Sequence, residues 1–406
     1  VTLNFGIDFK ESGNVTDIVW VDLNEDNFLD AIVVGYWMPI KVFMNDGKKL
    51  TLQKITQLQK TNGWWNSIKA NDFDKDACAT YKANIGNHIH CGDIDNLKPN
   101  LYQVAKNIDL VFGGPPCQGF SVAGKMDPHD PRSKHIWTFT EIVKKIKPKA
   151  FVMENVKALG KLKKWEPLRN ELLETFRDAG YIVNFIILNS SEFNVPQARE
   201  RVFFIGFKGN STIVPDLMKM IEPYKAESQT VREALSILDK AGTGNNKNTA
   251  KAKITITANP IMRKSPYAGM LFNGLGRPVK IDGFCATLPA TMGGNKTPII
   301  DEEALYNGKE NWIESYHKSI MEGGDPLPYQ VAPKRLRRLT VQEAIVIQSF
   351  PVDYQFMGSQ SSIFKQIGNA VPCNLGYAVA SMLVDSLNNE KIETLVDQPL
   401  QLRLVG

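Results

Sequence analysis

The sequence predicts an α/β protein, and short apolar runs are the main reason for this prediction. Residues 108–112 and 150–153 are short and apolar, as expected of buried parallel strands. A Gly-Gly-Pro-Pro turn follows the first run, and the carboxylate of Glu154 follows the second. Strands alternate with helices to about residue 207, and the chain then becomes rich in Gly, Asn and Lys. Because open α/β sheets bind ligands at the carboxyl ends of their strands, we expect the functional site there.

Cys117 stands in the first of these turns, in the segment VFGGPPCQGFS at residues 111–121. An isolated cysteine is more often a core residue than a nucleophile, because Cys is among the most buried residue types. A structural cysteine needs no Pro-Pro turn and no small flanking residues. The setting of Cys117 therefore favours a reactive thiol over a core position.

Five motifs in this chain resemble, in the same order, those of the DNA cytosine-5 methyltransferases. They are PPCQGFS at 115–121, ENV at 154–156, QARER at 197–201, RRLTVQEA with QSFP at 337–351, and QIGNAVP at 366–372. The resemblance runs over about residues 67–387. It implies a Rossmann-like, S-adenosylmethionine-dependent methyltransferase sheet with a smaller target-recognition domain inserted before the fourth motif.

The resemblance implies a catalytic set of Cys117, Glu154, Arg199 and Arg201. Cytosine C5 becomes nucleophilic only after a thiolate adds at C6, which is the role of Cys117. Glu154 must hold a proton to donate to N3, and a desolvated site favours this by raising its pKa. Arg199 and Arg201 share a face if extended, where they could fix the base, its phosphate and the thiolate. An ion-paired strand-end carboxylate and a solvated arginine pair are the alternatives.

The family flips its target cytosine out of double-stranded DNA. The resemblance makes Gln118, Ser121 and Gln197 DNA contacts, with Ser121 at the root of a mobile loop at 123–132. A restriction–modification system is the expected setting.

S-adenosylmethionine is the implied cofactor. Asp72 would hold its ribose hydroxyls, Phe73 would flank its adenine, and Asp93 would lie near the adenine amine. Pro115 and Asn369 would complete the pocket.

The interval 208–333 is the implied target-recognition domain. Base readout needs side chains that reach groove edges, and the candidates are Arg263, Arg277, Thr291 and Asn295. The part at 241–253 is better explained as a flexible linker.

The N-terminal segment, residues 1–68, does not show the family's first strand and Phe-x-Gly-x-Gly turn. It resembles instead an FG-GAP or VCBS repeat of β-propellers, with strands around an Asp-Gly turn at 46–47. This resemblance implies a β-rich segment and a possible calcium site; an acidic surface turn is the alternative. The implied ligands, oxygen donors at alternate positions with a fourth closing the loop, are Asp22, Asn24, Asp26 and Asp30.

Composition agrees with a globular DNA-binding protein but does not establish one. The chain has 406 residues, 43% of them hydrophobic and 22% charged, with a net charge of +5. Residues 1–76 carry eight Lys and eleven acidic residues, a balance of −3, so the remainder carries +8. Five cysteines without metal-like pairing indicate a reducing compartment. We expect a cytoplasmic monomer without a membrane span.

The expected domains are 1–68, a catalytic domain at 69–207, the recognition domain at 208–333, a return to the catalytic domain at 334–390, and a tail at 391–406. Two other classes remain open. One is a DNA-binding protein without turnover, because the glycine turn is missing. The other is a calcium-binding β-module fused to a methyltransferase fragment.

Overall fold

The computed structural model describes residues 14–21, 30–36, 41–45, 50–53, 69–105, 108–116, 134–209 and 214–388. The chain divides into two compact units, residues 1–70 and 71–406.

The first unit contains a four-stranded antiparallel sheet in the order β1-β2-β3-β4. Its strands are β1 (Asn14–Val21), β2 (Asp30–Tyr36), β3 (Lys41–Asn45) and β4 (Leu50–Gln53). Strands that follow one another in sequence are neighbours in the sheet. Val, Ile and aromatic residues recur in β1 and β2, and these residue types favour a pleated surface.

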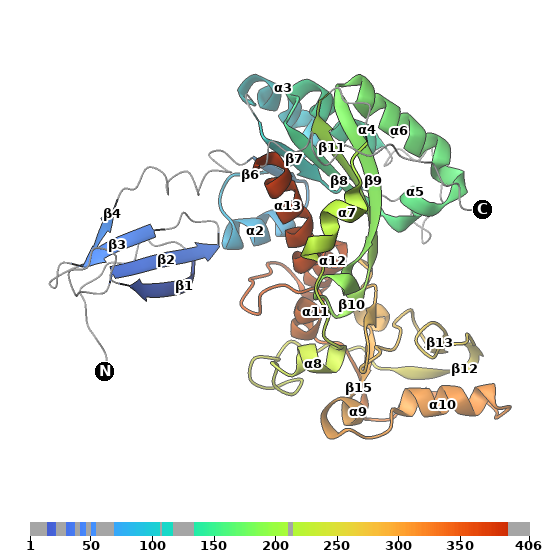
Figure 1. The fold of residues 1–406 in the computed structure, drawn as a ribbon. Helices are drawn as coiled ribbons and strands as arrows, with labels where there is room; N and C mark the ends of the chain where they lie inside the picture. The colour runs from blue at the N-terminus through green and yellow to red at the C-terminus, as the bar shows by residue number, and fades with distance from the viewer. Residues whose placement is uncertain are drawn as a thin grey trace. The chain divides into compact units, whose positions relative to one another are not determined.

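The second unit is built on a four-stranded sheet in the order β7-β8-β11-β9 (Figure 1). The strands β7 (Leu110–Gly113) and β8 (Ala150–Val156) are parallel, as the apolar runs predicted. β11 (Glu200–Lys208) lies antiparallel between β8 and β9 (Tyr181–Asn189). The two parallel strands therefore end at the same edge, where the sequence placed the site.

Helices cover both faces of this sheet. Side chains of β8 alternate between the two faces and pack against different helices on each. Phe151 and Met153 pack with α4 (Lys134–Ile146) and α6 (Glu166–Asp178). Ala150 and Val152 pack on the other face with α7 (Leu217–Ile221) and α13 (Cys373–Asn388). The helix α5 (Lys157–Lys161) and a 3₁₀ turn, η4 (Lys163–Trp165), connect β8 to α6.

A separate two-stranded sheet, β5 (Ala70–Asp72) with β6 (Ile89–Cys91), carries the predicted cofactor residues. Its helices are α2 (Lys75–Asn84) and α3 (Ile94–Val104). Lys98 on α3 pairs with Glu141 on α4 at 2.7 Å, and Thr80 on α2 donates to Gln366 at 2.7 Å. Within the described residues, no ladder joins this small sheet to the four-stranded one.

The recognition interval contains a three-stranded sheet, β13 (Met270–Phe272), β12 (Thr255–Ile261) and β16 (Gln330–Val331). The helix α10 (Trp312–Met321) shares a hydrophobic cluster with it. Two shorter pairings, in separate sheets, are β15 (Ile299–Asp301) with β17 (Leu336–Arg338) and β10 (Gln197–Ala198) with β14 (Cys285–Ala286).

One hydrophobic cluster crosses the expected boundary at 333/334. It contains residues of α8 (Val231–Leu235) and α9 (Glu302–Asn307) together with residues of α11 (Val341–Ile347) and α12 (Gln360–Asn369). The recognition interval therefore shares a core with the helices that follow it. A cut at residue 333 would divide this core.

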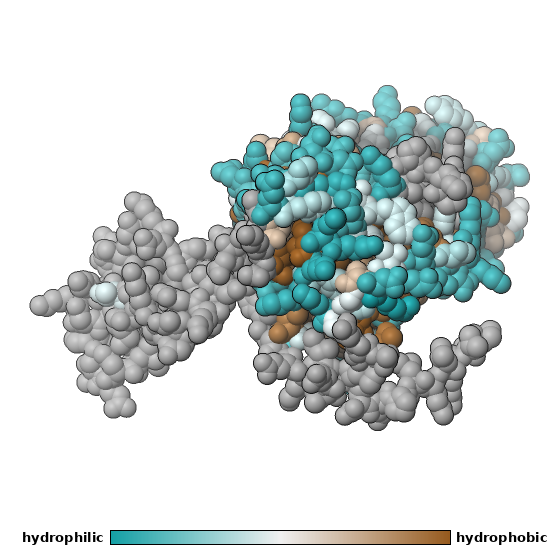
Figure 2. Space-filling view, turned by 90° about the horizontal axis from the view of Figure 1, so that it is seen from above, coloured by the Kyte–Doolittle hydropathy of each residue, from teal (hydrophilic) through white to brown (hydrophobic). Residues whose placement is uncertain are grey.

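The segment Gln360–Leu387 is long and apolar enough, by length and composition, to cross a membrane. In the structure it comprises two helices, α12 and α13, and Leu375, Val379 and Leu383 of α13 pack on the four-stranded sheet. These contacts are those of a core helix. The face of the molecule drawn in Figure 2 is mostly hydrophilic wherever it is coloured.

Candidate active site

The turn after β7 meets the end of β8 at the common edge of the parallel strands. Gly113 pairs with Met153, and a Cβ built on Gly114 would lie only 3.0 Å from Oε2 of Glu154. The Asn155 side chain donates from Nδ2 to the Pro115 carbonyl at 3.2 Å. The turn thus lies directly beside the Glu154 carboxylate. Cys117, Gln118 and Ser121 lie outside the described residues, so their assignments stay predictions.

Glu154 forms a close ion pair with Arg201. The Nε atom of Arg201 lies 2.8 Å from Oε1 of Glu154, and both side chains are largely buried. The pairing of β8 with β11 sets Arg201 opposite Val156, two residues beyond Glu154. Burial raises the pKa of the Glu154 carboxyl, and the positive charges of Arg201 and Arg199 oppose this rise. The arrangement can hold a proton on a carboxyl that faces the turn.

Arg199 occupies a different environment from Arg201, and the expectation that both fix the base stays a prediction. Its side chain is 1% exposed. Its guanidinium donates to the carbonyls of Leu288 at 3.0 Å, Gly368 at 2.9 Å and Asn369 at 3.4 Å. These bonds hold the guanidinium on backbone of the interval 208–333 and of α12.

Gln197 is also buried, and its side chain bonds within the protein; its role as a DNA contact stays a prediction. Its side chain is 0% exposed, its Oε1 accepts from the Leu288 amide at 2.9 Å, and its Nε2 donates to Gln348 Oε1 at 2.7 Å. Gln348 in turn donates to the carbonyls of Ile367 and Ala370. We call these two side chains the glutamine relay. Its members join β10, the recognition interval, α11 and the end of α12.

Sequence reasoning missed Gln348 as a functional residue. It follows four apolar residues, 344–347, that end α11, and it is 0% exposed. A polar residue directly after this apolar run was the available signal, because buried amides must find partners.

The predicted cofactor residues lie on or beside the small sheet and at the end of α12. Asp72 ends β5, and its carbonyl accepts from the Gly92 amide at 2.9 Å, which brings Asp93 alongside. One carboxylate oxygen of Asp72 accepts from the Asp74 amide at 2.8 Å, and burial raises the pKa of Asp72. Phe73 is 70% exposed and Asp93 caps α3.

These positions fit an adenosine group. The exposed Phe73 ring offers a face for stacking, and the Asp72 carboxylate at the end of β5 offers acceptor oxygens. Asn369 is exposed at the end of α12, and Pro115 lies in the turn beside Glu154.

The predicted recognition residues Arg263, Arg277, Thr291 and Asn295 are all exposed. The Gly276 amide donates to the Asn295 carbonyl at 3.2 Å, so the segments that carry Arg277 and Asn295 run side by side. The carbonyl of Arg263 is in contact with the His317 ring at 2.8 Å. Because they are exposed, these side chains are accessible to a ligand. The hydrogen bonds described above do not bring all four to one site.

Three of the four residues predicted to bind calcium, Asp22, Asn24 and Asp26, lie outside the described residues. Asp30 begins β2. Over the described part of the chain, His, Cys, Asp and Glu form no group of three that could hold a metal. The calcium site stays a prediction.

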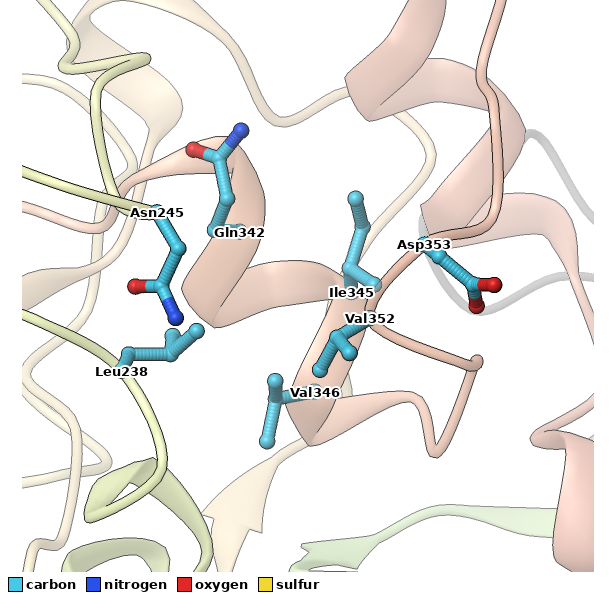
Figure 3. Close-up of a pocket in the computed structure, with 7 residues that line it drawn as sticks. All are labelled: Leu238, Asn245, Gln342, Ile345, Val346, Val352 and Asp353. Atoms are coloured by element: carbon cyan, nitrogen blue, oxygen red, sulfur yellow. The ribbon is translucent and has the colours of Figure 1, made fainter. Parts of the chain in front are cut away.

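A small cavity of about 140 Å³ lies beside α11 (Figure 3). Apolar side chains of α11 and its neighbours line it, with three polar residues; the lining is Leu238, Asn245, Gln342, Ile345, Val346, Val352 and Asp353. None of the predicted catalytic or cofactor residues lines this cavity. Three of its lining residues, Leu238, Ile345 and Val346, belong to or pack against the hydrophobic cluster that crosses residue 333.

The fold is that of known methyltransferases. The chain is similar in structure to the Dnmt2 methyltransferase of S. pombe, with a TM-score of 0.56 and 18% identity over 80% of this chain and 92% of that one. It is similar also to the methyltransferase EhMeth of Entamoeba histolytica, with a TM-score of 0.54 and 17% identity over 79% and 90% of the two chains.

Residues 46–385 match the family model described as C-5 cytosine-specific DNA methylase, and the chain belongs to this family. Two relatives are similar in sequence over most of their length. The type II methyltransferase M1.HphI of Haemophilus parahaemolyticus is 31% identical over 77% of this chain and 79% of its own. The type II methyltransferase M.DdeI of Desulfomicrobium norvegicum is 32% identical over 79% and 83%. The protein is thus a DNA cytosine-5 methyltransferase.

Proposed function

We propose that this methyltransferase acts through Cys117 as nucleophile and Glu154 as proton donor. The supporting observation is that the turn leading to Cys117 lies against the Glu154 carboxylate, which Arg201 holds at 2.8 Å. The Cys117 thiolate adds to C6 of a flipped-out cytosine while Glu154 donates its proton to N3. Electron density then moves to C5, which forms the new bond to carbon.

In this proposal Arg201 orients Glu154. Arg199 acts indirectly, by donating to the backbone carbonyls of Leu288, Gly368 and Asn369. S-adenosylmethionine supplies an electrophilic methyl group when bound. Asp72, Phe73, Asp93, Pro115 and Asn369 would hold it. The N3 proton returns to Glu154 as C5 forms its new bond. Loss of the C5 proton to water and departure of the Cys117 thiolate then restore the aromatic base.

The substrate is double-stranded DNA, from which the target base is extruded because it cannot be reached inside the stack. Gln118 and Ser121 would contact the DNA from the loop after Cys117. In the interval 208–333, the exposed Arg263, Arg277 and Thr291 would contact groove edges.

The biological setting we propose is a restriction–modification system, because the relatives are type II methyltransferases. In that setting the protein would be a cytoplasmic monomer, free of any membrane. The five cysteines show no metal-like spacing, which agrees with a reducing compartment.

For residues 1–68 we propose an origin outside the methyltransferase family, as an FG-GAP or VCBS-like segment with possible calcium ligands at Asp22, Asn24, Asp26 and Asp30. The sequence motif supports this. The absence of a ladder between β5-β6 and the four-stranded sheet, within the described residues, agrees with a missing first strand. Cofactor affinity should then be weak.

A mechanism-based trap tests the chemistry. Duplex DNA in which 5-fluorocytosine replaces cytosine should form a covalent adduct with the chain in the presence of S-adenosylmethionine, because fluorine cannot leave C5 as a proton does. Cys117→Ser should form none while keeping its circular dichroism spectrum, since the hydroxyl is a far weaker nucleophile. Adduct formation by the Ser variant would refute the role of Cys117.

A further inference from the structure

The segment directly after β8 is strongly basic. Residues 157–164, KALGKLKK, contain four lysines in eight positions. Lys157 forms an ion pair with Glu200. Lys161, Lys163 and Lys164 are exposed. Within the residues that the structure describes, no carboxylate forms an ion pair with Lys161 or Lys163. We call Lys161, Lys163 and Lys164 the lysine ridge.

The ridge stands on a firmly packed support. Ala158, Leu159 and Gly160 of α5 are buried, and a Cβ on Gly160 would lie 2.8 Å from Val202 Cγ2, so α5 lies directly on β11. The Arg169 guanidinium donates to the carbonyls of Leu159 at 3.0 Å and Leu162 at 3.2 Å. The backbone that carries the lysines is therefore held in place before any ligand binds, which limits the entropy cost of binding.

The ridge follows the carboxyl end of β8, the strand that carries Glu154. Val156, the last residue of β8, pairs with Arg201, and Arg201 holds Glu154. A second group of lysines, Lys144, Lys145, Lys147 and Lys149, lies at the other end of β8. Seven residues of strand separate the two groups, or roughly 20 Å at the usual rise. Only the ridge is at the end where the chemistry occurs.

We propose that the lysine ridge binds backbone phosphates of the substrate DNA next to the flipped nucleotide. This inference rests on the proposed function, since it assumes that DNA lies at the carboxyl edge of the sheet. Extruding a base requires the backbone to be held, and phosphate contacts position a duplex without reading its sequence. Exposed ammonium groups on a fixed support suit this task, because each is a compact charge on a flexible stem.

The salt dependence of DNA binding tests the ridge without requiring methyl transfer. Binding of a fluorophore-labelled duplex of mixed sequence is measured by anisotropy over a series of KCl concentrations. Each phosphate contact contributes about 0.9 to the slope of log K against log salt. Lys161→Ala/Lys163→Ala should reduce the magnitude of the slope by about 1.8, which is two contacts. Lys161→Arg/Lys163→Arg should keep the wild-type slope.

The matched control is Lys144→Ala/Lys145→Ala, which removes the same charge from the exposed last turn of α4. Its slope should equal that of the wild type. Equal slopes in the wild type and the ridge variant, or equal losses in the ridge and control variants, would overturn the proposal. A wild-type chain that binds no duplex would overturn the proposed function as well.

Discussion

At the scale of single residues, the carboxyl group of Glu154 is the predicted catalytic group whose surroundings the structure describes most fully. It is largely buried, lies beside the turn that leads to Cys117, and faces one arginine at 2.8 Å. Burial raises its pKa above the usual value for glutamate. A raised pKa means that the proton stays on the carboxyl to higher pH, which is the direction that the proposed donation to cytosine N3 requires.

Glu154→Gln should lower the methylation rate on the order of 10²–10³-fold, as when one preorganised donor to a transition state is lost. The amide can donate a hydrogen bond to N3 but cannot transfer a proton. In the wild type the single-turnover rate should fall as pH rises through the raised pKa of Glu154. The variant should lose this pH dependence, as a pH–rate profile would reveal. The same descending limb in both proteins would show that another group titrates.

At the scale of elements, the glutamine relay and Arg199 connect segments that are far apart in the chain. Gln348 gives both amide hydrogens to carbonyls near the end of α12 and accepts from Gln197. Only one orientation of each amide satisfies these partners, because the Leu288 amide is a donor and the α12 carbonyls are acceptors. The relay therefore sets how β10 meets α11 and α12.

Gln348→Met keeps the volume but leaves buried polar groups without partners, so the free energy of unfolding should fall by about 2–4 kcal/mol. Urea denaturation measures the loss. Gln360→Met is the matched control: Gln360 is exposed on α12 with a single bond to the Thr249 carbonyl. Its effect should stay within about 0.5 kcal/mol. Equal losses in the two variants would argue against the relay.

A glycine in β11 gives a second prediction at this scale. A Cβ on Gly206 would lie 2.1 Å from the Phe151 ring, within the core beneath α4 and α6. Gly206→Ala should destabilise the protein by about 1–3 kcal/mol or more through overpacking. Gly376→Ala in α13, where a Cβ would meet nothing within 4 Å, should instead stabilise it by up to about 1 kcal/mol. Thermal unfolding of both variants checks the difference in sign.

At the scale of the whole molecule, we propose that residues 1–66 lack the first strand of the cofactor-binding sheet. The first strand and its glycine turn supply hydrogen-bond partners to a central sheet as well as ligand contacts. In the described residues, β5-β6 and β7-β8-β11-β9 remain separate sheets.

The chain should therefore bind S-adenosylmethionine weakly, which isothermal titration calorimetry measures. Replacing residues 1–66 with a methyltransferase N-terminus that bears the Phe-x-Gly-x-Gly turn should restore tight binding and DNA methylation. The control is the same replacement with Cys117→Ser, which should bind the cofactor but transfer nothing. Tight binding by the unaltered chain would contradict the proposal that the first strand is missing.

Exchange of residues 208–333 for the matching interval of a related enzyme should change the DNA sequence that is bound, as selection from a random duplex pool would show. Because a hydrophobic cluster crosses residue 333, the exchange should also destabilise the protein unless α11 and α12 are carried with it. An unchanged preference would move the readout to the loop after Ser121.

The sequence by itself determined the family, the α/β class, the parallel strands β7 and β8 and the meeting of the turn with Glu154. These features follow from local periodicity and from the rule that parallel strands present their carboxyl ends at one edge. The sequence could not distinguish Arg199 from Arg201, because both stand in one motif with the same spacing. Nor could it find Gln348 or the core that crosses residue 333.

The tertiary structure decided these points through contacts between distant parts of the chain. Arg199 bonds to carbonyls 89 and 169 positions away, and Gln197 to a side chain 151 positions away. Local pattern carries no information about such partners, whereas burial forces each polar group to find one. Arg199 bonds to the backbone of two distant segments, whereas Arg201 forms an ion pair with Glu154.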